Sequence, residues 1–76
     1  PTTAHSRVLE HHLPAADAFT VRRLAEAGVI SLGKLATHEF AFGGPSFDLP
    51  WPPARNPWNP DHMPAGSSSG TGAAVA

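Results

Sequence analysis

The apolar and polar residues of the first third of the chain recur with the period of a helix. Four apolar residues share one face of that helix: Ala18, Val21, Leu24 and Ala25. Pro14 precedes the segment, where a missing N–H costs little, and Gly28 follows it, where a left-handed residue ends many helices. The pattern therefore predicts a helix over about residues 15–27.

Directly after this glycine the pattern changes to a short β-branched and apolar run, Val-Ile-Ser-Leu. The run predicts a buried strand over about residues 29–33. A shorter helix is expected over about residues 37–42, with Thr37 as its N-cap. A helix, a glycine turn and a strand form half of an α/β unit, so we expect an α/β fold with a mixed, mainly parallel sheet covered by helices.

Both periodic patterns end in the proline-rich segment over residues 43–64. Seven of the nine prolines lie there, and that density excludes a helix or a central strand. Three large aromatic side chains are spaced through it: Phe47, Trp51 and Trp58. Because disordered linkers usually lack such side chains, we expect an ordered loop packed on a larger body.

The amino-acid composition excludes several classes of function. The 76 residues include no cysteine, which excludes a thiol nucleophile and a thiolate metal site. Five Lys and Arg stand against six Asp and Glu, with no basic stripe for nucleic acid to follow. No apolar run approaches the roughly 20 residues needed to cross a membrane. We therefore expect a cytoplasmic chain in which this segment binds neither nucleic acid nor membrane.

The glycine-serine loop over residues 65–71, AGSSSGT, is the strongest candidate for chemistry. A flexible linker is one interpretation, but residues 72–76, GAAVA, resemble the start of an apolar helix instead. A phosphate cradle is a second, although no lysine follows the last glycine and the glycine spacing does not match the nucleotide motifs. A catalytic serine is the third, and it requires a partner that takes the hydroxyl proton.

Several blocks in order along the chain resemble the amidase signature family. Residues 1–4 read PTTA, residues 33–43 read GKLATHEFAFG, residues 55–59 read RNPWN, and residues 64–70 read PAGSSSG. The resemblance covers essentially the whole chain. It implies one slice of an α/β amidase fold that is not an autonomous domain, an interpretation that also suits a chain whose last residues open a helix.

The family resemblance implies a Ser–cis-Ser–Lys triad, in which a bridging serine relays a proton between a neutral lysine and a nucleophilic serine. Ser67 matches the bridging serine, with Gly66, Ser68 and Gly70 supporting its loop. The family's catalytic lysine and nucleophile match no residue of this chain. Lys34, the only lysine, matches a family lysine outside the triad, so it is not assigned as the base.

The resemblance also places Ala41, Phe42 and Gly43 beside the scissile amide, which they would line through backbone groups. His38-Glu39 resembles the start of a zinc helix, but no second histidine follows at the required spacing. No metal or cofactor is therefore expected. Arg55 is expected either to brace the proline-rich loop or to be a plain surface arginine.

These observations predict part of an amidase that hydrolyses a small-molecule carboxamide through a serine acyl-enzyme. An amidotransferase A-type subunit, which releases ammonia for an acyl acceptor together with a partner subunit, is the alternative. A third interpretation is an inactive fragment that needs the remainder of a parent chain. We expect the isolated 76 residues to hydrolyse no amide, because lysine base, nucleophile and oxyanion hole are not among them.

Overall fold

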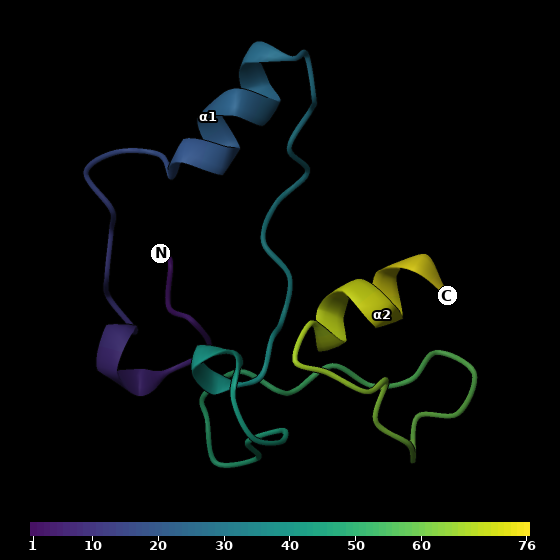
Figure 1. The fold of residues 1–76 in the computed structure, drawn as a ribbon. Helices are drawn as coiled ribbons and strands as arrows, with labels where there is room; N and C mark the ends of the chain where they lie inside the picture. The colour runs from purple at the N-terminus through teal and green to yellow at the C-terminus, as the bar shows by residue number, and fades with distance from the viewer.

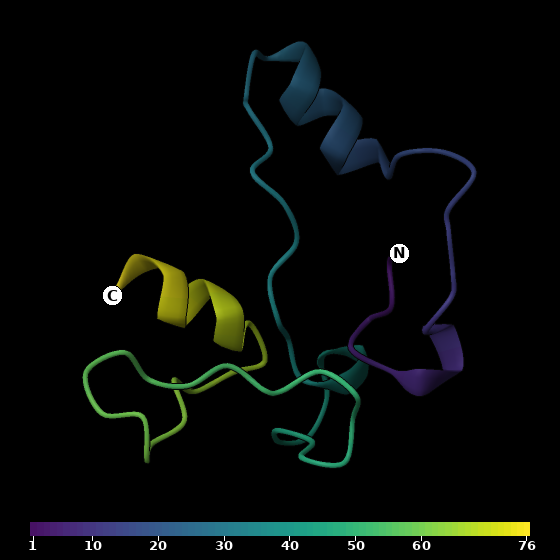
Figure 2. The ribbon, with the colours of Figure 1, turned by 180° about the vertical axis from the view of Figure 1, so that it is seen from behind.

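The computed structural model describes all 76 residues as two α-helices and two short 3₁₀ helices joined by long irregular segments (Figure 1). The elements in chain order are η1 (Arg7–Leu9), α1 (Phe19–Glu26), η2 (Glu39–Ala41) and α2 (Ser69–Val75). The two α-helices do not pack against each other. Seen from behind, α1 again stands apart from α2 and from the lower part of the chain (Figure 2).

The expected α/β fold with a mixed sheet is wrong for this structure, which contains no strand. Residues 29–37 have no regular structure. A strand requires a neighbouring strand to receive its backbone hydrogen bonds, and no other segment of the chain lies beside this one as a strand. Ile30 and Leu32, expected to be buried, are 82% and 98% exposed.

The helix α1 ends where the sequence predicts a glycine cap. Gly28 has a φ of +84°, and its N–H donates to the carbonyl of Ala25 at 3.0 Å. The N–H of Val29 donates to the carbonyl of Leu24 at 3.0 Å, which completes a Schellman motif. The helix begins at Phe19, four residues after the expected start, and no side chain caps its N-terminus.

The helix α1 lies within a long excursion of the chain over residues 13–33. Both ends of the excursion are hydrogen-bonded to Thr2. In Figure 1 the excursion carries α1 away from the rest of the chain. The N–H of Thr2 donates to the carbonyl of His12 at 2.9 Å, and the amine of Lys34 donates to the Thr2 hydroxyl. The Lys34 amine also lies 3.4 Å from the carbonyl of Pro1. The excursion therefore leaves the rest of the chain and returns to it at one place.

No hydrophobic side chain is buried in this structure. The buried residues are all polar or glycine: His5, Ser6, His38, Ser69 and Gly70. They lie where the N-terminal segment, η2 and the start of α2 meet. Hydrogen bonds, rather than an apolar core, therefore hold the three segments together.

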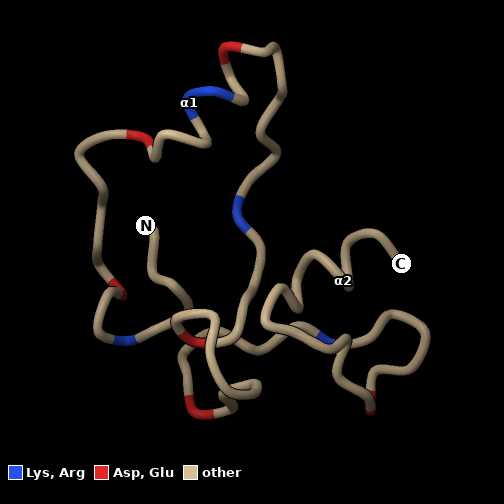
Figure 3. The backbone as a smooth tube through the Cα atoms, viewed as in Figure 1, with Lys and Arg blue, Asp and Glu red and all other residues tan.

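Charged side chains are dispersed along the chain without a large cluster of one sign (Figure 3). The one ion pair joins Arg23 to Glu26 on the exposed surface of α1. Neither α-helix combines the length and the apolar character that crossing a membrane requires.

We predict that residues 1–76, synthesised alone, show no cooperative thermal unfolding. Helices of eight and seven residues are too short to be stable in water without packing, and no apolar side chain is buried to supply it. Far-UV circular dichroism during heating measures this, with a gradual and nearly linear change as the expected result. A sigmoidal transition would contradict the prediction.

Candidate functional site

The carbonyl of Ser67 is held by two donors from a distant part of the chain. The backbone N–H of His38 donates to it at 2.9 Å, and the hydroxyl of Thr37 donates to it at 2.8 Å. The peptide bond between Gly66 and Ser67 is cis. Ser67 is half-buried, and its hydroxyl has no hydrogen-bond partner within the 76 residues. The backbone of Ser67 is thus fixed while its hydroxyl remains available.

A second contact joins the same two segments three residues further along the chain. The N–H of Gly70 donates to the carbonyl of Ala36 at 2.8 Å, and the hydroxyl of Ser69 lies 3.4 Å from that carbonyl. A Cβ on Gly70 would lie 2.7 Å from the Ala36 oxygen, too close for any side chain. We call the contacts between residues 36–38 and residues 67–70 the clasp.

The clasp leads directly into α2. Ser68 is the N-cap of this helix, although its side chain makes no capping hydrogen bond. Its carbonyl accepts from the N–H groups of Thr71 and Gly72, at 3.1 and 3.2 Å. The exposed Ser68 therefore supports the loop through its backbone, while Ser69 is 4% exposed within the clasp.

The imidazole of His38 lies between two parts of the site. It is 6% exposed, and its Nδ1 lies 2.9 Å from the carbonyl of Gly43. A Cβ built on Gly66 would overlap the imidazole ring, so the ring packs directly on the glycine backbone. The residue therefore contacts both the loop of Ser67 and the stretch expected to line the scissile amide.

That stretch, Ala41 to Gly43, follows the tight turn of η2. Phe40 and Ala41 have φ values of 49° and 60°, in the left-handed region that glycine and turn residues favour. The N–H of Ala41 donates to the carbonyl of His38, and the N–H of Phe42 donates to the carbonyl of Glu39. The carbonyls of Ala41 and Phe42 accept no hydrogen bond within the chain, so they are open to an external donor.

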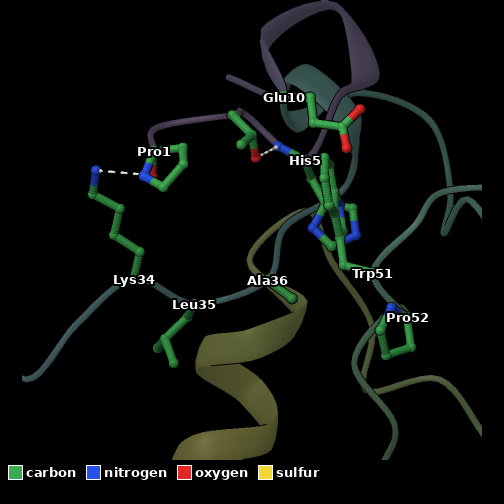
Figure 4. A pocket seen from close by; sticks show the side chains of 9 residues that line it. Pro1, His5, Glu10, Lys34, Leu35, Ala36, Trp51 and Pro52 are labelled. Carbon is green, nitrogen blue, oxygen red and sulfur yellow. Dashed lines mark hydrogen bonds between the residues drawn. The ribbon is translucent and has the colours of Figure 1, made fainter. Parts of the chain in front are cut away.

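A second buried histidine lies in the N-terminal segment, directly after Ala4, whose carbonyl accepts from the N–H of Phe40 in η2. His5 is 8% exposed, and its ring packs edge-on against Trp51 with 5.8 Å between the ring centroids. Burial lowers the pKa of His5, the Glu39 carboxylate opposes that shift, and His38 adds to it. An open hollow of about 400 Å³ lies beside these rings, with Lys34 and Pro1 at its far edge (Figure 4).

The comparison with protein families identifies the chain. The model of the Amidase family matches residues 1–76. The chain belongs to the amidase family. The resemblance inferred from the sequence blocks is therefore confirmed.

Relatives of this amidase segment are similar over nearly all of its length. It is 52% identical over 75 residues, which are 99% of the chain, to the A-type subunit of the glutamyl-tRNA(Gln) amidotransferase of Exiguobacterium sibiricum. It is 51% identical over 76 residues, which are 100% of the chain, to the protein of the same name from Nitratidesulfovibrio vulgaris. The chain spans 16% of the length of either relative. No solved structure matches the chain.

The structure brings together most of the residues that the sequence assigns to the amidase site. Gly66, Ser67 and Gly70 lie in or beside the clasp, and Gly43 is joined to Gly66 through the His38 ring. Phe42 is different, because its side chain is 86% exposed. The side-chain amine of Lys34 is bound to the N-terminal segment.

The sequence interpretation missed the structural role of His38, which it weighs only as a metal ligand. Its partner Gly66 lies 28 positions away, so no local pattern signals the contact. The structure contains no group of three or more His, Cys, Asp or Glu residues that could hold a metal ion. Arg55, for which two roles were open, contacts the Phe47 ring and the carbonyl of Pro60 within the proline-rich loop.

We predict that Gly70→Ala disrupts the clasp. The added methyl group meets the backbone of Ala36, which cannot move aside as a flexible side chain would. In the full-length protein that contains this segment, overpacking of this kind costs about 1–3 kcal/mol of unfolding free energy. Denaturant unfolding measures it. Gly44→Ala is the matched control, because a Cβ there meets nothing within 4 Å; equal effects of the two changes would contradict the prediction.

We also predict that the buried His5 makes the stability of the full-length protein sensitive to acid. Its pKa is lowered in the folded state, so the unfolded chain binds the proton more readily. The stability contributed by neutral His5 is present above its unfolded pKa of about 6.5 and is lost as the pH falls through that value toward the folded pKa. Denaturant midpoints at pH 7.5 and 5.5 should differ less for His5→Gln than for wild type. His11→Gln, at an exposed position, should leave the wild-type difference unchanged.

Proposed function

We propose that the chain is a segment of an enzyme that cleaves the C–N bond of a small-molecule carboxamide, with Ser67 as the bridging serine of a Ser–Ser–Lys relay. A nucleophilic serine attacks the carboxamide carbon and forms an acyl-enzyme, while the C–N bond breaks and ammonia or an amine leaves. Water then attacks the acyl-enzyme, releasing the acid and the serine. Ser67 passes the proton between the lysine and the nucleophile in both steps.

The observation that carries this proposal is that the backbone of Ser67 is fixed while its hydroxyl is not hydrogen-bonded. Its carbonyl is fixed by two hydrogen bonds from His38 and Thr37, whereas its hydroxyl has no partner within the chain. A relay hydroxyl must donate one proton and accept another from groups at defined positions. Fixing the backbone and leaving the hydroxyl available supports such a role.

The substrate amide is proposed to lie along Ala41, Phe42 and Gly43. A primary carboxamide carries two N–H donors, and the carbonyls of Ala41 and Phe42 are unpaired acceptors in this stretch. Gly43 differs because the imidazole of His38 already occupies its carbonyl. The proposed substrate contacts are therefore two backbone oxygens next to the loop of Ser67.

The lysine, the nucleophile and the oxyanion donors are proposed to come from other segments of a longer chain. The chain spans 16% of the length of its relatives, and its apolar side chains remain exposed. Such a surface suits a partial domain that packs on the remainder of the parent chain. On this proposal residues 1–76 alone are inactive, because a relay serine without nucleophile and base starts no reaction.

An amidotransferase is the second candidate, and the names of the relatives favour it. The two proteins at 52% and 51% identity are both named as A-type subunits of a glutamyl-tRNA(Gln) amidotransferase. In that case water still hydrolyses the acyl-enzyme, and the released ammonia attacks an activated carboxyl group of a glutamyl-tRNA, where a C–N bond forms as the C–O bond to the activating group breaks. Further subunits take part in this transfer. The expected cytoplasmic location suits this candidate, because charged tRNA is used there. Glutamine turnover by the full-length protein that rises on addition of glutamyl-tRNA and the partner subunits would favour transfer over simple hydrolysis.

We predict that Ser67→Ala in the full-length protein lowers kcat/KM for amide cleavage by about a thousandfold or more, because members of a catalytic relay act as a unit. Ammonia release from a simple carboxamide measures it. Ser31→Ala is the matched control: this exposed serine makes no side-chain hydrogen bond and lies in the excursion, away from the clasp. Activity of Ser67→Ala near that of Ser31→Ala would overturn the proposed function.

A further inference from the structure

One side chain connects the two parts of the proposed site. The imidazole of His38 is bonded through Nδ1 to the carbonyl of Gly43 at 2.9 Å, and its ring packs on Gly66, the residue before Ser67. The backbone of the same residue donates to the carbonyl of Ser67. No other residue is hydrogen-bonded to both the proposed substrate stretch and the loop of the bridging serine.

The hydrogen bond to Gly43 settles which nitrogen of His38 carries the proton. A backbone carbonyl only accepts, so Nδ1 must donate. The other nitrogen, Nε2, is buried and has no hydrogen-bond partner. An N–H at that position would be an unsatisfied buried donor, which is costly. The neutral ring with its proton on Nδ1 is therefore the form that fits, and this form has no proton to offer the substrate through Nε2.

The packing of the His38 ring against Gly66 leaves no room for a side chain at that position. The glycine lacks the Cβ that would overlap the ring, so the flat imidazole rests on the backbone itself. The ring thereby contacts the Gly66 backbone and, through Nδ1, the carbonyl of Gly43. Movement of either backbone segment would break the Nδ1 hydrogen bond or open a gap beside the glycine.

We propose that His38 is a positioning residue of the amidase site, which holds the Gly43 carbonyl and the Ser67 loop in register through its Nδ1–H and the face of its ring. The proposal rests on the proposed function of Ser67. Losing this register displaces the substrate amide from the relay, and a misplacement of about 1 Å can cost about a hundredfold in rate. The effect falls on kcat more than on KM, because the substrate's other contacts are unchanged.

The test compares His38→Asn with His38→Gln in the full-length protein. The amide nitrogen of asparagine can take the place of Nδ1, whereas the longer glutamine side chain puts its amide at the place of Nε2. Asparagine keeps the donor to Gly43 but lacks the ring face that packs on Gly66, so we expect His38→Asn to lower kcat by less than about tenfold and to keep the wild-type pH profile. We expect His38→Gln to lower kcat by about 10–100-fold with KM changed less than about threefold.

Several results would overturn the proposal. Equal activities of the two variants would show that the Nδ1 hydrogen bond does not matter, and a changed pH profile in His38→Asn would indicate proton transfer by the ring. Loss of thermal stability in step with loss of kcat would indicate a folding role instead. Ser67→Ala in the same assay separates the two proposals: if it is inactive, only the role of His38 is at stake, and if it is active, both proposals fail.

Discussion

The arrangement of this chain depends on the carbonyl of Ser67 and the two hydrogen bonds that it accepts. With no apolar side chain buried, the clasp is what brings the glycine-serine loop to residues 36–38. Hydrogen bonds of this kind contribute about 0.5–1.5 kcal/mol each in net terms. They can define how two segments meet, but apolar packing is needed to make such an arrangement stable. Hydrogen bonds thus define the geometry and apolar packing provides the stability. This difference explains how a site can have a defined geometry in a segment that has no apolar core of its own.

The sequence predicts elements whose cause is local. The helical period and Gly28 correctly indicate α1 and its Schellman cap, because both signals lie within a few residues of the structure they produce. The strand predicted over residues 29–33 is absent for the opposite reason. Its β-branched residues show that a strand is possible there, but a strand also needs a partner segment. The clasp could not be predicted either, since its two sides lie about 30 residues apart in sequence.

Two glycines of the loop serve a different physical purpose from the one that a glycine-rich sequence usually indicates. Neither Gly66 nor Gly70 has a positive φ, whereas Ala65 beside them has a φ of 63°. The two glycines are needed because another group approaches too closely for a side chain, the His38 ring in one case and the Ala36 backbone in the other. The two glycines are therefore required by contacts with residues distant in sequence and not by the backbone conformation of the loop.

The excursion over residues 13–33 leaves and rejoins the chain at Thr2. Because both ends of the excursion are fixed at Thr2, a change in its conformation has little effect on the conformation of the rest of the chain. Doubling its length would add only about 0.6 kcal/mol of closure entropy. This part of the chain can therefore be lengthened, shortened or replaced in evolution while the clasp stays as it is.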